Sequence, residues 1–591
     1  MPFDSPFDSN WNNSPFGGDD SWWNDYIAGG ISPALILSYY QGKYYNDGTS
    51  KDFPELVDSA ADDIKSAWMP NGGIGWRGHN YITQSTLQSG WGAGNLATIT
   101  PNQVTAPDGS LTGAEVYLDS GSIASQIYQL AAGTTGGAIT ISAWVKSDSG
   151  SENFRFSIWN TVDLVQRSAD ITAPTSWTLV SFEVAISKET TVYMIRQTAA
   201  VSSTIHVWGF HVYRSDYGGM QLNEDGSTYF PTTSAAYYAP AVAYDPASLV
   251  RTGHVQELAL NRLNTYPVCK KTAGWLNTNV TSTDLSLDVF GVFNGVEVTS
   301  TGNALGNLAQ TASVTYTAAD VHYFDVYYRA GTSGNLMIKI RDTTAAVNSL
   351  IVGAAGSLAV TLSSAGAISG LREVLLSDGV TYRVTGYITA ALSGDYGIYL
   401  GPSSSSAGET VIALGAFAGG AGEKLPHCPI IGDDGSTFTT AADIPTLDAG
   451  SEPFVGFDGS QGTWVFKGAW AETGGTTYQL VGGASERFIY QTVTTGAVRT
   501  YDGTTAVTKS GVLTDDTSIA VVQSYLEGGN FNILADGSTE SSAALTGDLA
   551  TTTIDIGHLA GANGMHGVIH EIIYYPVQLD LATRQGFEAN D

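Results

Sequence analysis

The stretch Ile205–Tyr213 (IHVWGFHVY) decides the fold of this chain. Its side chains fall into two alternating sets, and both are largely apolar: Ile205, Val207, Gly209, His211 and Tyr213 on one side, and His206, Trp208, Phe210 and Val212 on the other. An extended segment that is apolar on both faces is typical of a strand covered on each side, so we expect a central strand here. Gly, Asp-Gly and Pro residues crowd the following stretch up to Leu263 and predict a linker.

A similar pattern recurs further along the chain. Ile412–Phe417 (IALGAF) is followed by Gly419–Gly420, by Asp434–Gly435–Ser436 and by Pro445, in the order of the first copy. We interpret the two stretches as the ends of duplicated modules. Strand patterns separated by Gly and Asp-Gly turns continue from Pro453 to the C-terminus, which is typical of a third β-sandwich.

Composition fits an all-β chain with an acidic surface. The 591 residues suffice for about four domains, and 69 Gly and 30 Tyr with only 14% charged residues suit short strands joined by tight turns. A net charge of −31 argues against nucleic acid or an anionic membrane as the main partner. Two cysteines, Cys269 and Cys428, match no metal-ligand spacing; a single bridge between them and two buried free thiols both stay open.

The N-terminal part contains an arm, a buried strand and a predicted helix. Residues 1–30 repeat Pro-Phe-Asp-Ser among further aromatics, which predicts an arm that orders against another surface; a disordered terminus is the alternative. Pro33–Tyr40 predicts a buried strand. Asp52–Trp68 predicts one helix, because Pro54 lies near its start and apolar residues recur every four positions. No basic segment precedes Lys43 and no apolar run reaches about 20 residues, so neither a secretion signal nor a membrane helix is expected.

These signals divide the chain into seven segments. We expect a docking arm over residues 1–30, a strand-helix anchor over 31–78, a first β-module over 79–216, a linker over 217–262, a second β-module over 263–420, a linker over 421–452 and a third β-module over 453–591.

Alternation within the predicted strands separates core side chains from outward ones. In 138–146 the apolar face is Ile139, Ile141, Ala143 and Val145, and in 153–160 it is Phe154, Phe156 and Ile158. Aromatic rings on the opposite faces suit sugar binding, because the C–H face of a sugar ring stacks on them. The candidate glycan-binding residues are Trp144, Trp159, Tyr323, Tyr327, Tyr387, Trp464 and Trp470. Packing against a neighbouring module is the alternative for each of them.

Several stretches resemble virion structural proteins of tailed bacteriophages. They are Pro33–Gly48 (PALILSYYQGKYYNDG), Asp225–Thr233 (DGSTYFPTT), Tyr244–Pro246 (YDP) and Gln256–Asn264 (QELALNRLN). In that family, jelly rolls similar to carbohydrate-binding modules are joined by such linkers. Gly567–Pro576 (GVIHEIIYYP) resembles the concanavalin A-like, or laminin-G-like, sandwiches that often end these proteins. The resemblance implies an all-β fold of two tandem jelly rolls and a concanavalin A-like sandwich, with a mostly extended N-terminal arm and one short helix.

The function implied by this resemblance is structural adhesion. We expect a non-enzymatic tail fibre or spike component on the virion exterior that attaches to host surface glycans and contacts other virion proteins through its arm. Such fibres are commonly trimers, so a homo-oligomer is expected, although no coiled-coil heptads are present. A capsid decoration or head-fibre protein and a glycan-degrading enzyme with accessory modules are the alternatives.

The sequence contains no G-x-S-x-G elbow and no P-loop. The Asp-Gly turns at Asp225 and Asp434 could ligate Ca²⁺, but they match no calcium-loop pattern. We therefore predict no catalytic residue, no cofactor and no metal ligand.

Overall fold

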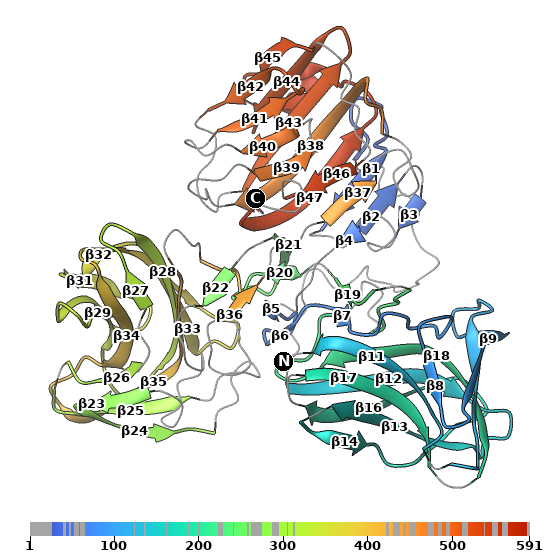
Figure 1. Cartoon of the computed structure of the whole chain (residues 1–591). Helices are drawn as coiled ribbons and strands as arrows, with labels where there is room; N and C mark the ends of the chain where they lie inside the picture. The colour runs from blue at the N-terminus through green and yellow to red at the C-terminus, as the bar shows by residue number, and fades with distance from the viewer. Residues whose placement is uncertain are drawn as a thin grey trace, which may run out of the picture.

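The computed structural model describes most of the chain. The described residues are 26–39, 43–46, 49–51, 58–59, 66–122, 124–134, 137–160, 162–186, 189–198, 201–222, 228–233, 235–239, 241–256, 259–261, 275–286, 295–303, 305–310, 314–420, 425–428, 438–440, 445–448, 457–470, 478–482, 487–491, 497–510, 518–536, 538–545, 553–557 and 565–587. They form an all-β protein of three antiparallel sandwiches arranged around a central region of short strands (Figure 1).

The first sandwich, sandwich 1, consists of a five-stranded and a six-stranded sheet. The first runs in the order β16 (Thr178–Ile186), β12 (Gly137–Lys146), β18 (Ser203–Arg214), β10 (Gly113–Leu118), β9 (Thr98–Val104). The second runs β14 (Leu164–Arg167), β13 (Asn153–Asn160), β17 (Glu189–Gln197), β11 (Gln126–Thr134), β8 (Gly92–Gly94), with β15 (Ile171–Thr172) paired to β13. The chain crosses repeatedly between the two sheets, as in a jelly roll.

The core of sandwich 1 follows the alternation expected from the sequence. All seven side chains predicted to face inward from β12 and β13 are buried in one cluster: Ile139, Ile141, Ala143, Val145, Phe154, Phe156 and Ile158. The expected central strand is also present, since β18 lies between β12 and β10. The sequence thus places the core side chains of these two strands correctly.

The alternation predicted within Ile205–Tyr213 is correct up to Trp208 and wrong beyond it. Gly209 has a φ of +65°, and the pairing of β12 with β18 shifts register at this point. Such a β-bulge adds one residue to the strand and reverses which side chains face inward. The core side chains of β18 are therefore Ile205, Val207, Phe210 and Val212.

The second sandwich, sandwich 2, has the same strand order with one further edge strand on each sheet. One sheet runs β24 (Val280–Asp284), β25 (Val296–Thr301), β35 (Ala407–Ala418), β28 (Val321–Ala330), β33 (Thr381–Ala390), β32 (Gly366–Leu375). The other runs β23 (Trp275–Thr278), β26 (Asn307–Gln310), β34 (Gly394–Pro402), β29 (Leu336–Asp342), β30 (Val347–Gly353), β31 (Ala359–Ser363), with β27 (Val314–Tyr316) on β34.

The C-terminal sandwich is built from both ends of the chain. Its larger sheet runs β3 (Thr49–Lys51), β2 (Lys43–Asn46), β1 (Leu35–Ser38), β47 (Gly567–Tyr575), β38 (Gln461–Trp470), β43 (Ser518–Leu526), β44 (Asn530–Ala535), β45 (Ser541–Ala544). Its smaller sheet runs β4 (Asp58–Ser59), β37 (Pro445–Asp448), β46 (Thr553–Ile556), β39 (Tyr478–Gly482), β40 (Arg487–Gln491), β41 (Val498–Tyr501), β42 (Ala506–Lys509). A short helix, α2 (Leu581–Gln585), follows the last strand.

The buried strand predicted at Pro33–Tyr40 is present as β1, and it completes the C-terminal sheet. Leu35 lies opposite Tyr574, and all four residues of β1 are buried. The strands β1, β2 and β3 therefore belong to the large sheet of the C-terminal sandwich. The linker strand β21 (Arg251–Gln256), which pairs with β20 (Val242–Tyr244), extends the same edge of β47.

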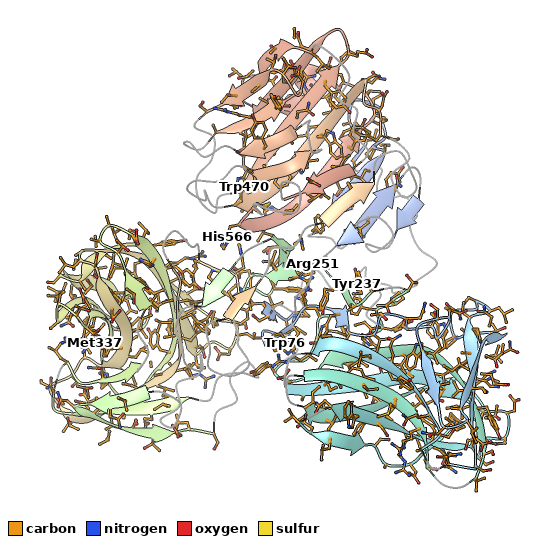
Figure 2. The ribbon with its side chains drawn as sticks, in the orientation of Figure 1. Trp76, Tyr237, Arg251, Met337, Trp470 and His566 are labelled. Atoms are coloured by element: carbon orange, nitrogen blue, oxygen red, sulfur yellow. The ribbon has the colours of Figure 1, made fainter. Side chains whose placement is uncertain are left out.

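The central region, which we call the junction, consists of short strand pairs and residues 425–428. The pairs are β5 (Ser66–Trp68) with β6 (Ile74–Trp76), β7 (His79–Asn80) with β19 (Tyr237–Tyr238), β20 with β21, and β22 (Ala259–Asn261) with β36 (Phe438–Thr440). Figure 2 shows Trp76 and Arg251 in this region, and Met337 and Trp470 in two of the surrounding sandwiches. The junction thus contains parts of both predicted linkers.

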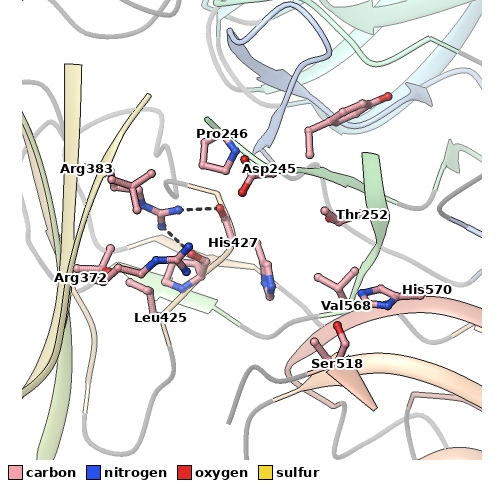
Figure 3. Close-up of a pocket in the computed structure, with 15 residues that line it drawn as sticks. Asp245, Pro246, Thr252, Arg372, Arg383, Leu425, His427, Ser518, Val568 and His570 are labelled. Atoms are coloured by element: carbon pink, nitrogen blue, oxygen red, sulfur yellow. Dashed lines mark hydrogen bonds between the residues drawn. The ribbon is translucent and has the colours of Figure 1, made fainter. Parts of the chain in front are cut away.

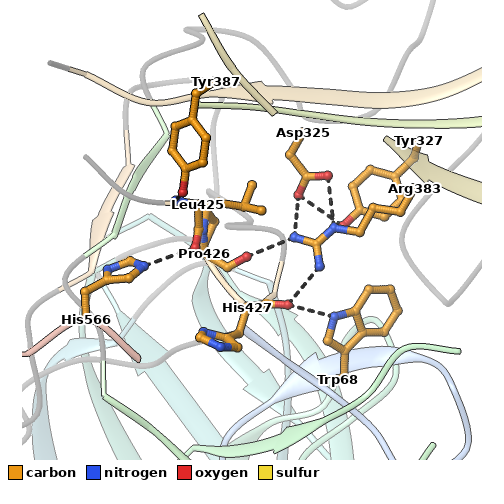
Figure 4. Close-up of polar contacts among 9 residues, drawn as sticks. All are labelled: Trp68, Asp325, Tyr327, Arg383, Tyr387, Leu425, Pro426, His427 and His566. Carbon is orange, nitrogen blue, oxygen red and sulfur yellow. Dashed lines mark hydrogen bonds and ion pairs between the residues drawn. The ribbon is translucent and has the colours of Figure 1, made fainter. Parts of the chain in front are cut away.

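Residues 425–427 tie the surrounding parts of the junction together (Figure 4). The guanidinium of Arg383, on sandwich 2, donates to the carbonyl oxygens of Pro426 (2.9 Å) and His427 (3.1 Å). The indole N–H of Trp68 donates to the same His427 oxygen at 3.0 Å. On the C-terminal side, the ring Nε2 of His566 lies 3.0 Å from the carbonyl oxygen of Leu425.

A buried ion pair holds Arg383 in place. Its Nη2 and Nε atoms donate to the two carboxylate oxygens of Asp325 at 2.8 and 3.0 Å. Although burial works against the charged form, the carboxylate raises the pKa of Arg383 above its usual value. The guanidinium therefore stays charged while it binds the linker carbonyls.

The helix predicted over Asp52–Trp68 is wrong where the structure describes it. Asp58–Ser59 and Ser66–Trp68 are strands, and the other residues between 52 and 65 lie outside the described part. Trp68 pairs with Ile74 in a hairpin and is buried in the junction. Tertiary packing of this tryptophan outweighs the helical spacing of the local sequence.

Other sequence predictions fall on residues outside the described part. Residues 1–25 of the predicted arm, Cys269 and the Asp-Gly turns at Asp225 and Asp434 are among them. Of the arm, Tyr26 is described, and its hydroxyl donates to the carboxylate of Glu571 at 2.6 Å. Cys428 is buried at the junction. Docking of the arm stays a prediction, and a bridge between the cysteines and calcium binding at the turns stay open alternatives.

Candidate active surface on sandwich 1

The outer face of the six-stranded sheet of sandwich 1 carries a solvent-accessible aromatic and aliphatic surface. Strand pairing places its outward residues in three cross-strand rows on β13, β17 and β11. We call this set the open face: Trp159, Val192 and Leu130; Ser157, Met194 and Tyr128; Arg155, Arg196 and Gln126. Their chain neighbours Phe156, Ile158, Ile195 and Ile127 fill the core, so alternation directs the open-face residues to the outer side of the sheet. In the middle row, however, Ser157 and Met194 are buried, so the accessible part of the face lies on either side of them.

Three large side chains of the open face are exposed. Trp159 is 40% exposed, Tyr128 37% and Leu130 56%. Glycine makes room for one of them, because a Cβ at Gly92 would lie 2.4 Å from the ring of Tyr128. Large apolar side chains that remain exposed together on one sheet face are a common mark of an interaction site.

Two arginines lie side by side at the other end of the same face. Arg155 and Arg196 are direct cross-strand partners, an arrangement that is unfavourable for like charges unless other groups compensate. Arg155 forms an ion pair with Asp170 at 3.0 Å and donates to the carbonyl oxygen of Thr198 at 2.9 Å. Its buried Nε atom has no hydrogen-bond partner among the described residues. The face therefore carries two guanidinium groups beside an aromatic surface.

The two tryptophans predicted for this module do not share a site. Trp159 lies on the open face, whereas Trp144 is half-buried on the outer face of the opposite sheet. There Trp144 pairs with Trp208, and Trp208 packs against the linker residue Tyr229 with ring centroids 4.9 Å apart. The thickness of the sandwich separates the two indoles, so one ligand cannot stack on both at once.

Of the tyrosines predicted for the second module, Tyr327 and Tyr387 contact the second linker. Tyr323 and Tyr327 are completely buried, and Tyr327 packs with Phe417 and Cys428 in the cluster that extends from sandwich 1. The hydroxyl of Tyr387 accepts a hydrogen bond from the backbone N–H of Leu425 at 3.3 Å (Figure 4). The predicted alternation correctly places these rings on the outer face of the sheet, but the linker covers part of that face. Tyr323 and Tyr327 therefore cannot stack on a ligand in this arrangement.

The tryptophans predicted for the third module are core residues. Trp464 is fully buried, with its ring centroid 4.6 Å from that of Tyr574. Trp470 is also buried and lies nearly perpendicular to the ring of Phe466, with the ring centroids 5.3 Å apart. Neither is available to a ligand, because both lie between the two sheets of the C-terminal sandwich.

Sequence reasoning missed Tyr128 and Leu130, because Gln126–Thr134 was not recognised as a strand. Its inward positions include a glutamine, Gln129, and its outward positions carry Tyr128 and Leu130, which inverts the usual pattern. The side chain of Gln129 accepts a hydrogen bond from the backbone N–H of Thr83 at 2.9 Å. The sequence does contain a signal for this strand, namely the alternation of its residues, provided that the set containing Gln129 is assigned to the core.

No helix among the described residues is both long and apolar enough to cross a bilayer. No cluster of three or more His, Cys, Asp or Glu side chains among them is arranged to hold a metal ion.

Comparison with known proteins leaves the function open. No protein-family model and no curated protein matches the chain. Among solved structures, the CBM40 of Ruminococcus gnavus IT-sialidase bound to α2,3-sialyllactose is 16% identical and covers 24% of this chain and 90% of its own, with a TM-score of 0.20.

Two other solved structures are similar at the same level. The CBM22-1–CBM22-2 tandem domain of Paenibacillus barcinonensis Xyn10C is 9% identical, covers 59% of this chain and 98% of its own, and has a TM-score of 0.23. Mouse laminin α1 domains LG4-5 are 13% identical, cover 47% of this chain and 89% of their own, and have a TM-score of 0.17. Such low scores carry no argument about ligands, and the fold assignment rests on the strand order above.

Proposed function

We propose that this chain is a non-enzymatic glycan-binding protein and that the open face of sandwich 1 is its contact surface. The observation that carries the proposal is the exposed row of Trp159 and Leu130 beside Tyr128, continued by Arg155 and Arg196. An indole and a phenol ring on a rigid sheet can stack against the C–H faces of sugar rings. Guanidinium groups at the end of the row can donate to sugar hydroxyls or carboxylates.

Binding without hydrolysis agrees with the residue types on this face. Glycoside hydrolysis requires two carboxyl groups that flank the scissile bond. The three cross-strand rows of the open face contain none. We therefore propose adhesion, in which many weak contacts gain strength from copy number.

We further propose that the protein acts as a tail fibre or spike component on the outside of a tailed-phage virion. The support is the sequence resemblance together with the three β-sandwiches of the chain. A capsid decoration or head-fibre protein would have the same modules. Imaging of labelled protein on intact particles distinguishes the two, and a signal confined to the head would contradict the tail assignment.

The test of glycan binding compares two tryptophans on opposite faces of one sandwich. Full-length protein is measured on a glycan array and then by affinity retention on the glycans it selects. Trp159→Ala should weaken binding by about 30-fold, which corresponds to about 2 kcal/mol for an aromatic hot spot. Trp144→Ala is the matched control and should leave binding unchanged.

Thermal unfolding of both variants shows whether the fold is intact. Equal retention by wild type and Trp159→Ala would remove the open face from the site. Release of reducing ends from a retained glycan, abolished by substitution of a single carboxylate, would replace adhesion with hydrolysis.

A further inference from the structure

A cavity of about 290 Å³ lies where three parts of the molecule meet (Figure 3). Sandwich 2 contributes residues of β32 and β33, the C-terminal sandwich contributes residues of β38, β43 and β47, and the two linkers supply the remaining walls. This volume is at the lower end of the range for small-molecule sites, which occur preferentially at domain interfaces. The cavity is separate from the open face of sandwich 1.

The polar groups of this cavity include both donors and acceptors. Arg372 enters from sandwich 2, His427 from the linker, and His570 and Ser518 from the C-terminal sandwich (Figure 3). Burial, with the nearby His427 and Lys467, lowers the pKa of His570 to about 4. At neutral pH its ring is therefore uncharged, and one ring nitrogen can donate while the other accepts.

The charges around the cavity are balanced in pairs. Asp245 on the cavity wall interacts electrostatically with Arg372 and accepts hydrogen bonds from Ser248 and the backbone N–H of Ala247. Arg383 is neutralised by Asp325, as described above. Lys467, which lies near His570, pairs with Glu571 at 3.1 Å. Among the described residues around the cavity, the charges thus offset one another and do not favour an ionic ligand over a neutral one.

Apolar groups line the rest of the cavity. Val374, Leu425, Pro246 and Val568 provide aliphatic surface, and Tyr244 provides an aromatic ring. A cavity with aliphatic walls, hydroxyls, the neutral imidazole of His570 and a balanced guanidinium matches a molecule with C–H faces and a hydroxyl-bearing edge.

We propose that this cavity binds an uncharged, polyhydroxylated ligand of monosaccharide size. The site goes beyond the proposed contact surface on sandwich 1 and does not depend on it. Because its walls come from two sandwiches and the linkers between them, a bound ligand contacts all of them only in the docked arrangement. Occupancy therefore stabilises that arrangement by mass action.

The proposal is tested by ligand-observed NMR on the full chain. The probes are glucose, galactose, mannose and N-acetylglucosamine, with glucuronate as the charged comparison. At least one neutral sugar should bind saturably in the millimolar range, which is typical of ligands this small, and should raise the unfolding temperature. Absence of saturable binding by all four sugars would overturn the proposal. Stronger binding of glucuronate than of every neutral sugar would also overturn it, in favour of an anion site.

Substitutions that fill the cavity locate the binding. Ala469→Leu and Ser518→Leu each place additional side-chain atoms on its wall and should weaken sugar binding at least about tenfold. Ala359→Leu, on the fully exposed edge strand β31, is the matched control and should bind as wild type. Unchanged binding in both wall variants would place the sugar elsewhere and refute the site.

A variant at the edge of the cavity provides a second test in case Ala469→Leu or Ser518→Leu disturbs the packing of the two sandwiches against each other. Arg372→Gln changes an exposed side chain on β32, so the fold should be retained. Loss of its guanidinium donors should weaken neutral-sugar binding several-fold. Wild-type affinity in this variant, with an unchanged scattering profile, would contradict the assignment of Arg372 to the site.

Discussion

Sandwiches 1 and 2 have the same strand order, yet the corresponding sheet is open in one and closed in the other. On sandwich 1 this outer face exposes Trp159, Tyr128 and Leu130. On sandwich 2 the matching strand β29 carries Met337 and Lys339, both buried, and the ammonium of Lys339 lies 4.7 Å from the ring centre of Tyr399. The fold alone therefore does not determine the site. What differs is the set of outward side chains. Where these side chains pack against one another, as Lys339 does with Tyr399, the face is less available to a partner.

The second sheets of the two sandwiches differ in how they are covered. In sandwich 1 the linker rings of Tyr229 and Phe230 pack on His211. In sandwich 2 the linker is fastened by the buried pair of Asp325 and Arg383. The contact of the linker with sandwich 1 involves the neutral imidazole of His211, whereas its contact with sandwich 2 involves the Asp325–Arg383 ion pair. The stability of the two sandwiches should therefore respond differently to pH and to mutation.

Acid should produce the largest effect, and sandwich 1 should lose stability first. Burial lowers the pKa of His79 to about 3 and that of His211 to about 4, whereas an unfolded histidine titrates near 6.5. Between pH 6.5 and these values the unfolded state binds more protons. Each histidine should therefore cost about 1.4 kcal/mol of stability per pH unit as the pH falls, with no loss above pH 6.5.

The measurement is hydrogen exchange of strand amides at pH 7, 6 and 5, corrected for intrinsic rates. Amides of β18 should lose protection before those of β35, because burial lowers the pKa of two histidines on sandwich 1, His79 and His211, but of one described histidine on sandwich 2, His322. His211→Gln should reduce the pH dependence. Loss of amide protection at the same pH in both sandwiches would contradict the predicted difference in acid sensitivity.

Breaking the ion pair of sandwich 2 should have the next largest effect. Asp325→Ala leaves the buried guanidinium of Arg383 uncompensated and should cost about 3–5 kcal/mol of stability. Denaturant unfolding measures the loss. The more exposed pair of Arg329 and Asp378 is the control, and Asp378→Ala should cost about 1 kcal/mol or less. Equal costs would show that Arg383 does not fasten the linker.

Removal of an arginine from the open face of sandwich 1 should weaken glycan binding, whereas removal of an arginine from the corresponding sheet of sandwich 2 should not. Arg155→Gln should reduce retention of carboxylate-bearing glycans by about tenfold, because a charge-assisted hydrogen bond is worth about 1.5–3 kcal/mol. Arg341→Gln on sandwich 2 should have no effect, since Arg341 donates to Asn348 at 3.0 Å within its own sheet. Affinity retention measures both variants, and an equal loss in the two would contradict a site confined to sandwich 1.

The smallest effect concerns the β-bulge of β18. Gly209→Ala forces a side chain into a positive φ and brings its Cβ to 3.2 Å from Trp144, so it should cost about 1–2 kcal/mol. Gly356→Ala, at a φ of +83° on sandwich 2, meets only the distant ring of Tyr382 and should cost about 1 kcal/mol. Thermal unfolding compares them. A smaller cost at Gly209 would mean that Trp144 does not restrict the bulge.

The sequence predicted the fold better than it predicted the site, and the reasons are physical. Alternation correctly placed the core of β12 and β13, because each buried face has a period of two. It failed after Gly209, where one inserted residue reversed the alternation. It could not pair Leu35 with Tyr574, since no local signal reports a contact between the two ends of the chain. Nor could it reveal that a linker covers Tyr327, which depends on how separate modules dock.

The most direct test of the account is hydroxyl-radical footprinting of the full chain with and without a glycan that it retains. The account predicts that labelling of Trp159 and Tyr128 falls when the glycan is bound, while labelling of Trp144 and Tyr387 does not change. Protection of Trp144 or Tyr387 with Trp159 still fully labelled would contradict it, because the ligand would then lie on a different surface.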